Sequence, residues 1–220
     1  MVGYLNEVFS LHEEIKEIFD KDNKEIISVV LDELELINSA ARKIPHNNKY
    51  PNFAGANAIQ LTRIFNSLLS AYILISKGLI GETLLFLRAI GESQDLIELF
   101  IKEPHLTEKY FDGKNFESRD VRNKLDKTEF RKGRHRLFSG FIHPNLGYAT
   151  TVINDGIVHA GGIYKPEEIA NCLKLMALAG GYTLGLCREF IENNDDQEFK
   201  LWLRKSDYLV STMGKYDIKE

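Results

Sequence analysis

The stretch LLFLRAIGESQDLIELF, residues 84–100, decides the fold. Wound as a helix, it carries apolar side chains on every side, which is typical of a helix at the centre of a bundle. Arg88, Glu92 and Asp95 interrupt it, and at about 100° per residue these three charged residues fall within roughly 60° of one another. Unpaired charges are costly in a protein interior, so these groups are expected to be paired. We therefore predict a central helix that carries a short ionic stripe.

Helical periodicity continues on both sides of this segment. Apolar residues recur every three or four positions, which predicts helices over residues 3–20, 23–43, 53–77, 129–143, 165–193 and 199–210. Residues 105–128 are more polar, and we expect two short helices there, around Tyr110 and Val121. Pro104 and Pro144 cannot continue a helix, so the helices before them end at these points.

A different pattern occurs in ATTVINDGIVHAGG, residues 149–162. β-Branched residues flank Asn-Asp-Gly, which favours a tight turn between two strands. The predicted fold class is therefore all-α, a multi-helix bundle with one small β-hairpin at about 149–162. We expect a single helical domain over residues 1–220, in which residues 1–43 form an N-terminal helical hairpin docked on, or swapped from, the core bundle 53–205.

The predicted helix 23–43 presents an apolar inner face and an acidic outer one. Glu25, Asp32, Glu33 and Glu35 are expected on its solvent-exposed side. Residues 1–40 hold ten acidic residues against three lysines, whereas residues 119–136 hold eight basic residues against three acids. This asymmetry indicates either an anion bound on the basic side or an unevenly charged, solvated surface.

The two cysteines and the N-terminus bear on the cellular compartment. Cys172 and Cys187 fall in one helical pattern about 22 Å apart, too far to form a disulfide with each other. Reduced thiols favour an intracellular protein. The N-terminus is acidic and amphipathic and lacks the pattern of a signal peptide, and residues 80–90 are too short to span a bilayer. We expect a cytoplasmic protein without a membrane partner.

A second polar group lies in FRKGRHRLFSGFIHPN, residues 130–145. On a helix, Arg136, Ser139 and His143 line up opposite an apolar face, and the negative end of the helix dipole favours protonated His143. An arginine and a histidine on one stripe can hold a phosphate and exchange a proton with it. The basic residues Arg131, Lys132 and Arg134 would attract a polyanion such as RNA. A solvated surface, or a structural contact with Glu92 or Asp95, explains the same pattern.

The spacing of these residues resembles two known patterns. Arg136-x6-His143 looks like the R-x4–6-H element of the HEPN superfamily, compact helical bundles that include metal-independent RNA-cutting toxins and defence proteins. Arg88-x3-Glu92 followed by Ser139-x3-His143-Pro144 resembles a broad group of uncharacterised bacterial helical proteins over roughly residues 60–190. The HEPN likeness implies that Arg136 binds the scissile phosphate and that His143 acts as general acid or base, with a 2′-hydroxyl as nucleophile at a dimer interface.

Three functions follow from these patterns. The first is a helical binding or interaction module, expected to be a homodimer, in a setting such as bacterial defence or stress response. The second is a HEPN-like metal-independent endoribonuclease or RNA-binding protein that uses Arg136 and His143. The third is a small-molecule or metal-dependent enzyme, with a site between the 84–100 and 129–143 helices. Phosphate-binding glycine loops and paired metal-ligand motifs are absent from the sequence, so it predicts no cofactor and no metal.

Overall fold

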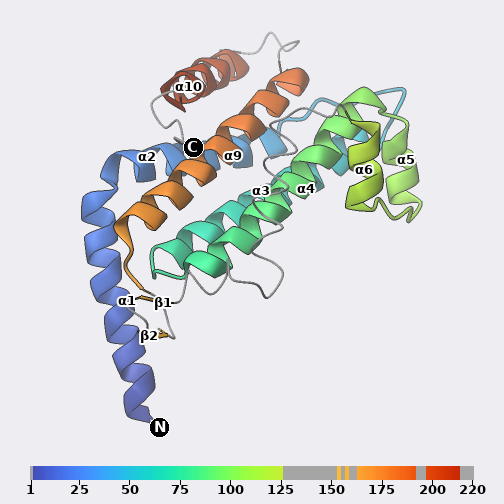
Figure 1. Ribbon diagram of the computed structural model, residues 1–220. Helices are drawn as coiled ribbons and strands as arrows, with labels where there is room; N and C mark the ends of the chain where they lie inside the picture. The colour runs from blue at the N-terminus through green and yellow to red at the C-terminus, as the bar shows by residue number, and fades with distance from the viewer. Residues whose placement is uncertain (1, 126–152, 155–156, 159–162, 192–196, 214–220) are drawn as a thin grey trace.

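The computed structural model describes residues 2–125, 153–154, 157–158, 163–191 and 197–213, and it shows an all-α bundle (Figure 1). Its helices are α1 (Val2–Asp22), α2 (Lys24–Ala41), α3 (Phe53–Ile75), α4 (Ile80–Lys102), α5 (Leu106–Phe111), α6 (Ser118–Lys124), α9 (Pro166–Ile191) and α10 (Gln197–Met213). Two strands of two residues each, β1 (Ile153–Asn154) and β2 (Ile157–Val158), pair antiparallel with Ile153 opposite Val158. The other residues of the hairpin predicted at 149–162 lie outside the described part of the chain.

The stretch 84–100 forms most of α4, and α4 is the central helix that its composition predicts. It packs against α3 on one side and α9 on another, while α5 and α6 cover the end at which it stops (Figure 1). Buried residues occur all around it, among them Leu84, Leu87, Ile90, Ile97, Leu99 and Phe100. It ends at Lys102, before Pro104, as predicted.

Gly78 makes the tight connection between α3 and α4. Its φ of 74° is in the left-handed region, which glycine adopts without strain. Its N–H donates to the carbonyl of Ile75 at 3.0 Å, and Leu79 N–H donates to Leu74 at 3.0 Å, so the last carbonyls of α3 are satisfied. The Gly78 carbonyl in turn accepts a hydrogen bond from Ile163 N–H at 3.2 Å, which ties the segment just before residue 166 to this turn.

The two N-terminal helices meet at one residue, Asn23. The backbone hydrogen-bond pattern runs through it, because Asn23 N–H donates to Phe19 at 3.1 Å and Ile27 N–H donates to Asn23 at 3.0 Å. α2 lies in the bundle against α9 and α3, whereas α1 extends away from the bundle at the end opposite α5 and α6 (Figure 1). We call α1 the N-terminal arm.

One prediction for α2 is wrong. Glu33 is not on the exposed side of this helix but is only 1% exposed, in the contact with Gly180 of α9. Val30, Leu34 and Ile37, its neighbours on that side, are buried in the main core. Glu25, Asp32 and Glu35 are exposed, as the sequence predicts.

α10 and α5 cover different parts of the bundle. α10 packs on α9 and α2, and the Trp202 indole N–H donates to the carbonyl of Leu36 at 3.0 Å. Near α5, a smaller core forms around Phe100, which contacts the rings of Tyr110 and Phe116 edge-on. The two short helices expected around Tyr110 and Val121 are α5 and α6.

α3 and α9 are long and apolar enough to cross a membrane by length and composition alone. The core helices of a water-soluble bundle meet the same criterion, and both helices contribute buried residues to the main core. Length and composition are therefore weak evidence for a membrane span in α3 or α9.

Candidate functional site

The predicted ionic stripe of α4 forms an ion-paired cluster with α3. Arg88 Nε donates to Glu92 Oε1 at 3.1 Å across one turn of α4. A second cation joins from α3, because Arg63 Nη2 lies 3.7 Å from Glu92 Oε2. The side chains of Arg63, Arg88 and Glu92 are 48%, 34% and 21% exposed, so the cluster lies at the surface of the α3–α4 pair. One carboxylate between two arginines leaves a local surplus of positive charge.

Asp95, the third member of the predicted stripe, is turned into the protein. It is 2% exposed, in the same buried stretch of α4 as Ser93 and Gln94. The Gln94 amide donates to the carbonyl of Ala179 at 2.8 Å and to the hydroxyl of Thr183 at 2.9 Å, which links α4 to α9. The stripe therefore divides into a surface ion cluster and a buried polar layer.

Arg63 is the residue of this cluster that the sequence interpretation missed. It is the only charged residue in α3, Phe53–Ile75. A single charge in a long apolar helix is a usable signal, because it needs either solvent or a partner. Its partner lies on the neighbouring helix, and that pairing follows from the antiparallel register of α3 and α4.

Apolar side chains surround the ion cluster on the solvent side of α3. Ile59, Leu69 and Ile73 share one helical face of about 120° with Arg63, and all three are exposed, Ile73 by 52%. Leu85 of α4 is also exposed. It lies in the part of α4 that packs against α3, because the hydroxyl of nearby Thr83 is 3.5 Å from the Ala71 carbonyl of α3. We call Ile59, Leu69, Ile73 and Leu85, with the ion cluster, the outer face.

The N-terminal arm continues this apolar surface. Lys77, just after α3, pairs with Glu13 of the arm at 2.7 Å, and this contact lowers the pKa of the Glu13 carboxyl. Phe9 lies one turn before Glu13 on the same side of the arm and is 61% exposed. The arm is also held by Phe19, whose ring contacts Tyr72 edge-on, and by Asp22, which accepts a hydrogen bond from Tyr164 at 2.6 Å.

The second predicted polar group lies outside the described residues. It comprises Arg136, Ser139 and His143, together with the basic residues Arg131, Lys132 and Arg134. Its meeting with Arg88, Glu92 and Asp95 stays a prediction.

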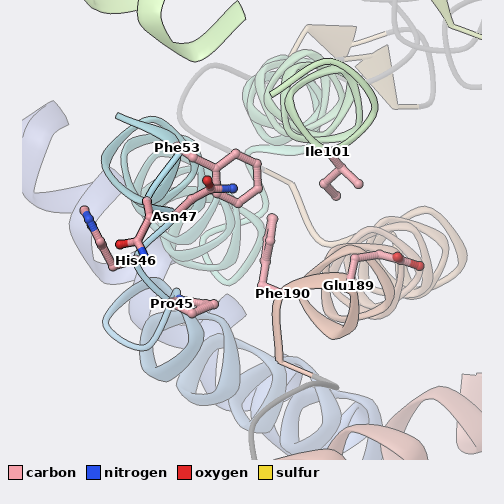
Figure 2. A pocket seen from close by; sticks show the side chains of 8 residues that line it. Pro45, His46, Asn47, Phe53, Ile101, Glu189 and Phe190 are labelled. Carbon is pink, nitrogen blue, oxygen red and sulfur yellow. The ribbon is translucent and has the colours of Figure 1, made fainter. Parts of the chain in front are cut away.

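A separate pocket of about 450 Å³ opens beside the loop that precedes α3 (Figure 2). Phe53 and Phe190, whose ring centroids lie 5.8 Å apart, line it with Ile101. Figure 2 shows the side chains of His46 and Glu189 pointing away from the space between these apolar residues. Among the described residues that line the pocket, the floor is therefore apolar and no charged side chain is directed into it.

The cysteines and possible metal ligands add no further site to the described part of the chain. Cys172 and Cys187 are unbridged and buried, as predicted, and burial raises the pKa of the Cys172 thiol to about 12. Within the described ranges, no three His, Cys, Asp or Glu side chains are grouped so that they could hold a metal ion.

Comparison of the chain with models of protein families, with curated proteins and with solved structures finds no match.

Proposed function

We propose that this protein is a helical interaction module that associates with a second copy of itself through the outer face and the N-terminal arm. The observation that carries the proposal is the exposure of Phe9 and Ile73, which lie four residues before Glu13 and Lys77, the two partners of an ion pair. Large apolar groups gathered on one surface, around a few charges, are typical of protein–protein contacts.

Charge complementarity favours a second copy as the partner. The arm carries six acidic residues and two lysines, Glu7, Glu13, Glu14, Glu17, Asp20 and Asp22 against Lys16 and Lys21. The outer face carries a surplus cation at Arg63 and Arg88. The acidic, apolar arm of one copy thus complements the basic, apolar outer face of the other. In a two-fold symmetric dimer this contact between arm and outer face occurs twice.

The test measures self-association by sedimentation equilibrium. Wild type is expected at twice the 25.2 kDa of one chain at micromolar concentration. Phe9→Ser and Ile73→Ser each remove an apolar anchor worth roughly 1.5–3 kcal/mol, so each should weaken the dimer at least about tenfold. Since both side chains are exposed in the single chain, the melting temperature of the isolated chain should change little.

Leu201→Ser is the matched control. Leu201 is 54% exposed on α10, away from the outer face, so its loss should leave association unchanged. A chain that stays monomeric at all concentrations, or an equal weakening by Leu201→Ser, contradicts the proposal.

A second candidate is a HEPN-like, metal-independent ribonuclease or RNA-binding protein. The surplus positive charge at Arg63 and Arg88 favours it, as do Arg119 and Arg122 on α6, because arginine side chains attract phosphate. In this candidate Arg136 binds the scissile phosphate and His143 transfers the proton, as the resemblance implies.

Cleavage of a mixed single-stranded RNA pool in EDTA tests the second candidate. Wild type should cleave the pool, His143→Ala should cleave it at least about a hundredfold more slowly with an unchanged melting curve, and RNA binding should weaken steeply with salt. Absence of cleavage by wild type, with binding insensitive to salt, would exclude this candidate.

A further inference from the structure

The most unusual group in the described chain is the carboxyl of Glu33. It is 1% exposed, and neither of its oxygens has a hydrogen-bond partner there. A buried polar group without a partner is destabilising, and a charged one far more so. The side chain lies so close to α9 that a Cβ on Gly180 would be 2.7 Å from the Glu33 Cδ, so only glycine at position 180 leaves room for it.

A third helix, α10, packs on both α2 and α9, the two helices that enclose Glu33. Trp202 ties α10 to Leu36, about one turn along α2 from Glu33. Ser206, one turn beyond Trp202, is fully buried, and its hydroxyl also lacks a partner in the described chain. Unsatisfied polar groups on α2 and α10 thus occur where these helices and α9 pack together.

The charges on the surrounding helices do not neutralise Glu33. Arg63 of α3 pairs with Glu92, Arg188 of α9 with Asp207 of α10, and Asp22 of the arm accepts from Tyr164. Lys205 of α10 borders a surface groove with Asp32 and Glu35, and the buried thiols Cys172 and Cys187 of α9 have raised pKa values and stay neutral. Burial, and then the neighbouring Asp32 charge, raise the pKa of Glu33 well above 4.5.

We propose that the α2–α9 contact is a proton-dependent joint: a neutral Glu33 lets α2 pack on Gly180, and a charged Glu33 loosens α2 and the arm from the bundle. Given the proposed function, this joint regulates the same interaction, because α2 carries the arm that reaches the second copy. Raising the pH frees the arm from its own bundle.

The direction of the pH dependence follows from linkage. A raised pKa in the folded state means that the joint is fully stable below the ordinary pKa of 4.5 and loses stability as the pH rises through the folded-state pKa. Between these two values, the opening constant of α2 rises about tenfold per pH unit.

Hydrogen exchange of the full chain tests the joint, with protection factors followed in residues 24–41 from pH 5 upward. Wild-type protection should fall about tenfold per pH unit and then level off, whereas Glu33→Gln should remove this dependence. Glu35→Gln removes the same charge from an exposed position two residues away, so it should behave like wild type. The same pH profile in wild type and Glu33→Gln would overturn the proposal.

Two further measurements keep the result interpretable. If Glu33→Gln does not fold, the carboxyl carbon of Glu33 is titrated by NMR in wild type, and an ordinary pKa near 4.5 overturns the proposal. Sedimentation of the same samples gives the association constant. A pH-dependent joint in a chain that stays monomeric would support the joint and reject self-association.

Discussion

Replacing Gly78 with alanine is expected to lower the free energy of unfolding by on the order of 3 kcal/mol. Two costs combine there: alanine is strained by roughly 1–2 kcal/mol at a positive φ, and its Cβ overpacks against neighbouring atoms at a cost of about 1–3 kcal/mol. The neighbours are backbone atoms, because the Cβ would lie 2.5 Å from the Ile163 oxygen and 2.7 Å from its nitrogen. Chemical denaturation of the two proteins measures the difference.

Gly113→Ala separates the two costs. Gly113 has a similar φ of 83°, but among the described residues, its chain neighbours aside, no atom lies within 4 Å of its Cβ position. Its substitution should therefore show only the conformational cost of about 1–2 kcal/mol. Equal losses for Gly78→Ala and Gly113→Ala would mean that the approach of Ile163 to the turn is not tight in solution.

Gly180→Ala is expected to lower the free energy of unfolding by about 1–3 kcal/mol, although alanine is the better helix former. The added Cβ would lie 2.7 Å from Cδ and 3.2 Å from Cβ of Glu33, inside the contact between α9 and α2. Because Glu33 is enclosed, its side chain has no nearby solvent to move into. Thermal and chemical denaturation at fixed pH measure the loss.

Two controls identify the cause of this loss. Gly185 lies on the same helix, and outside that helix no atom of the described residues is within 4 Å of its Cβ position, so Gly185→Ala should stabilise the protein by roughly 0.5–1 kcal/mol. In a Glu33→Ala background, Gly180→Ala should lose most of its effect, giving a coupling energy above about 1 kcal/mol. Additive effects of the two substitutions would show that Glu33 does not fill this space.

Much of the fold could be predicted from periodicity. The all-round apolar pattern of 84–100 placed α4 at the centre, and Pro104 fixed its end, because both signals are local. Glu33 could not be placed in this way. Its neighbours Asp32 and Glu35 are exposed acids, and burial of one glutamate among them depends on a glycine in α9, more than a hundred residues later.

The same difference between local signals and contacts distant in sequence applies to the candidate site. Arg88 and Glu92 pair at the i, i+4 spacing that one helix dictates, whereas Arg63 joins them only through the register of α3 against α4. Phe9 followed the apolar period of its helix, and that period predicts a buried face. The arm extends away from the bundle, so Phe9 stays exposed in the described part of the chain (Figure 1).

The arm changes direction relative to α2 at a single residue, Asn23, through which the backbone hydrogen bonds continue. A few side-chain contacts, at Phe19, Glu13 and Asp22, hold the arm in its direction. A 21-residue helix is about 30 Å long, so a swing of roughly 10° at its base carries the far end through about 5 Å. Small displacements of α2 are thus amplified along the arm, and Phe9, in its N-terminal half, moves farther than the contacts near Asn23.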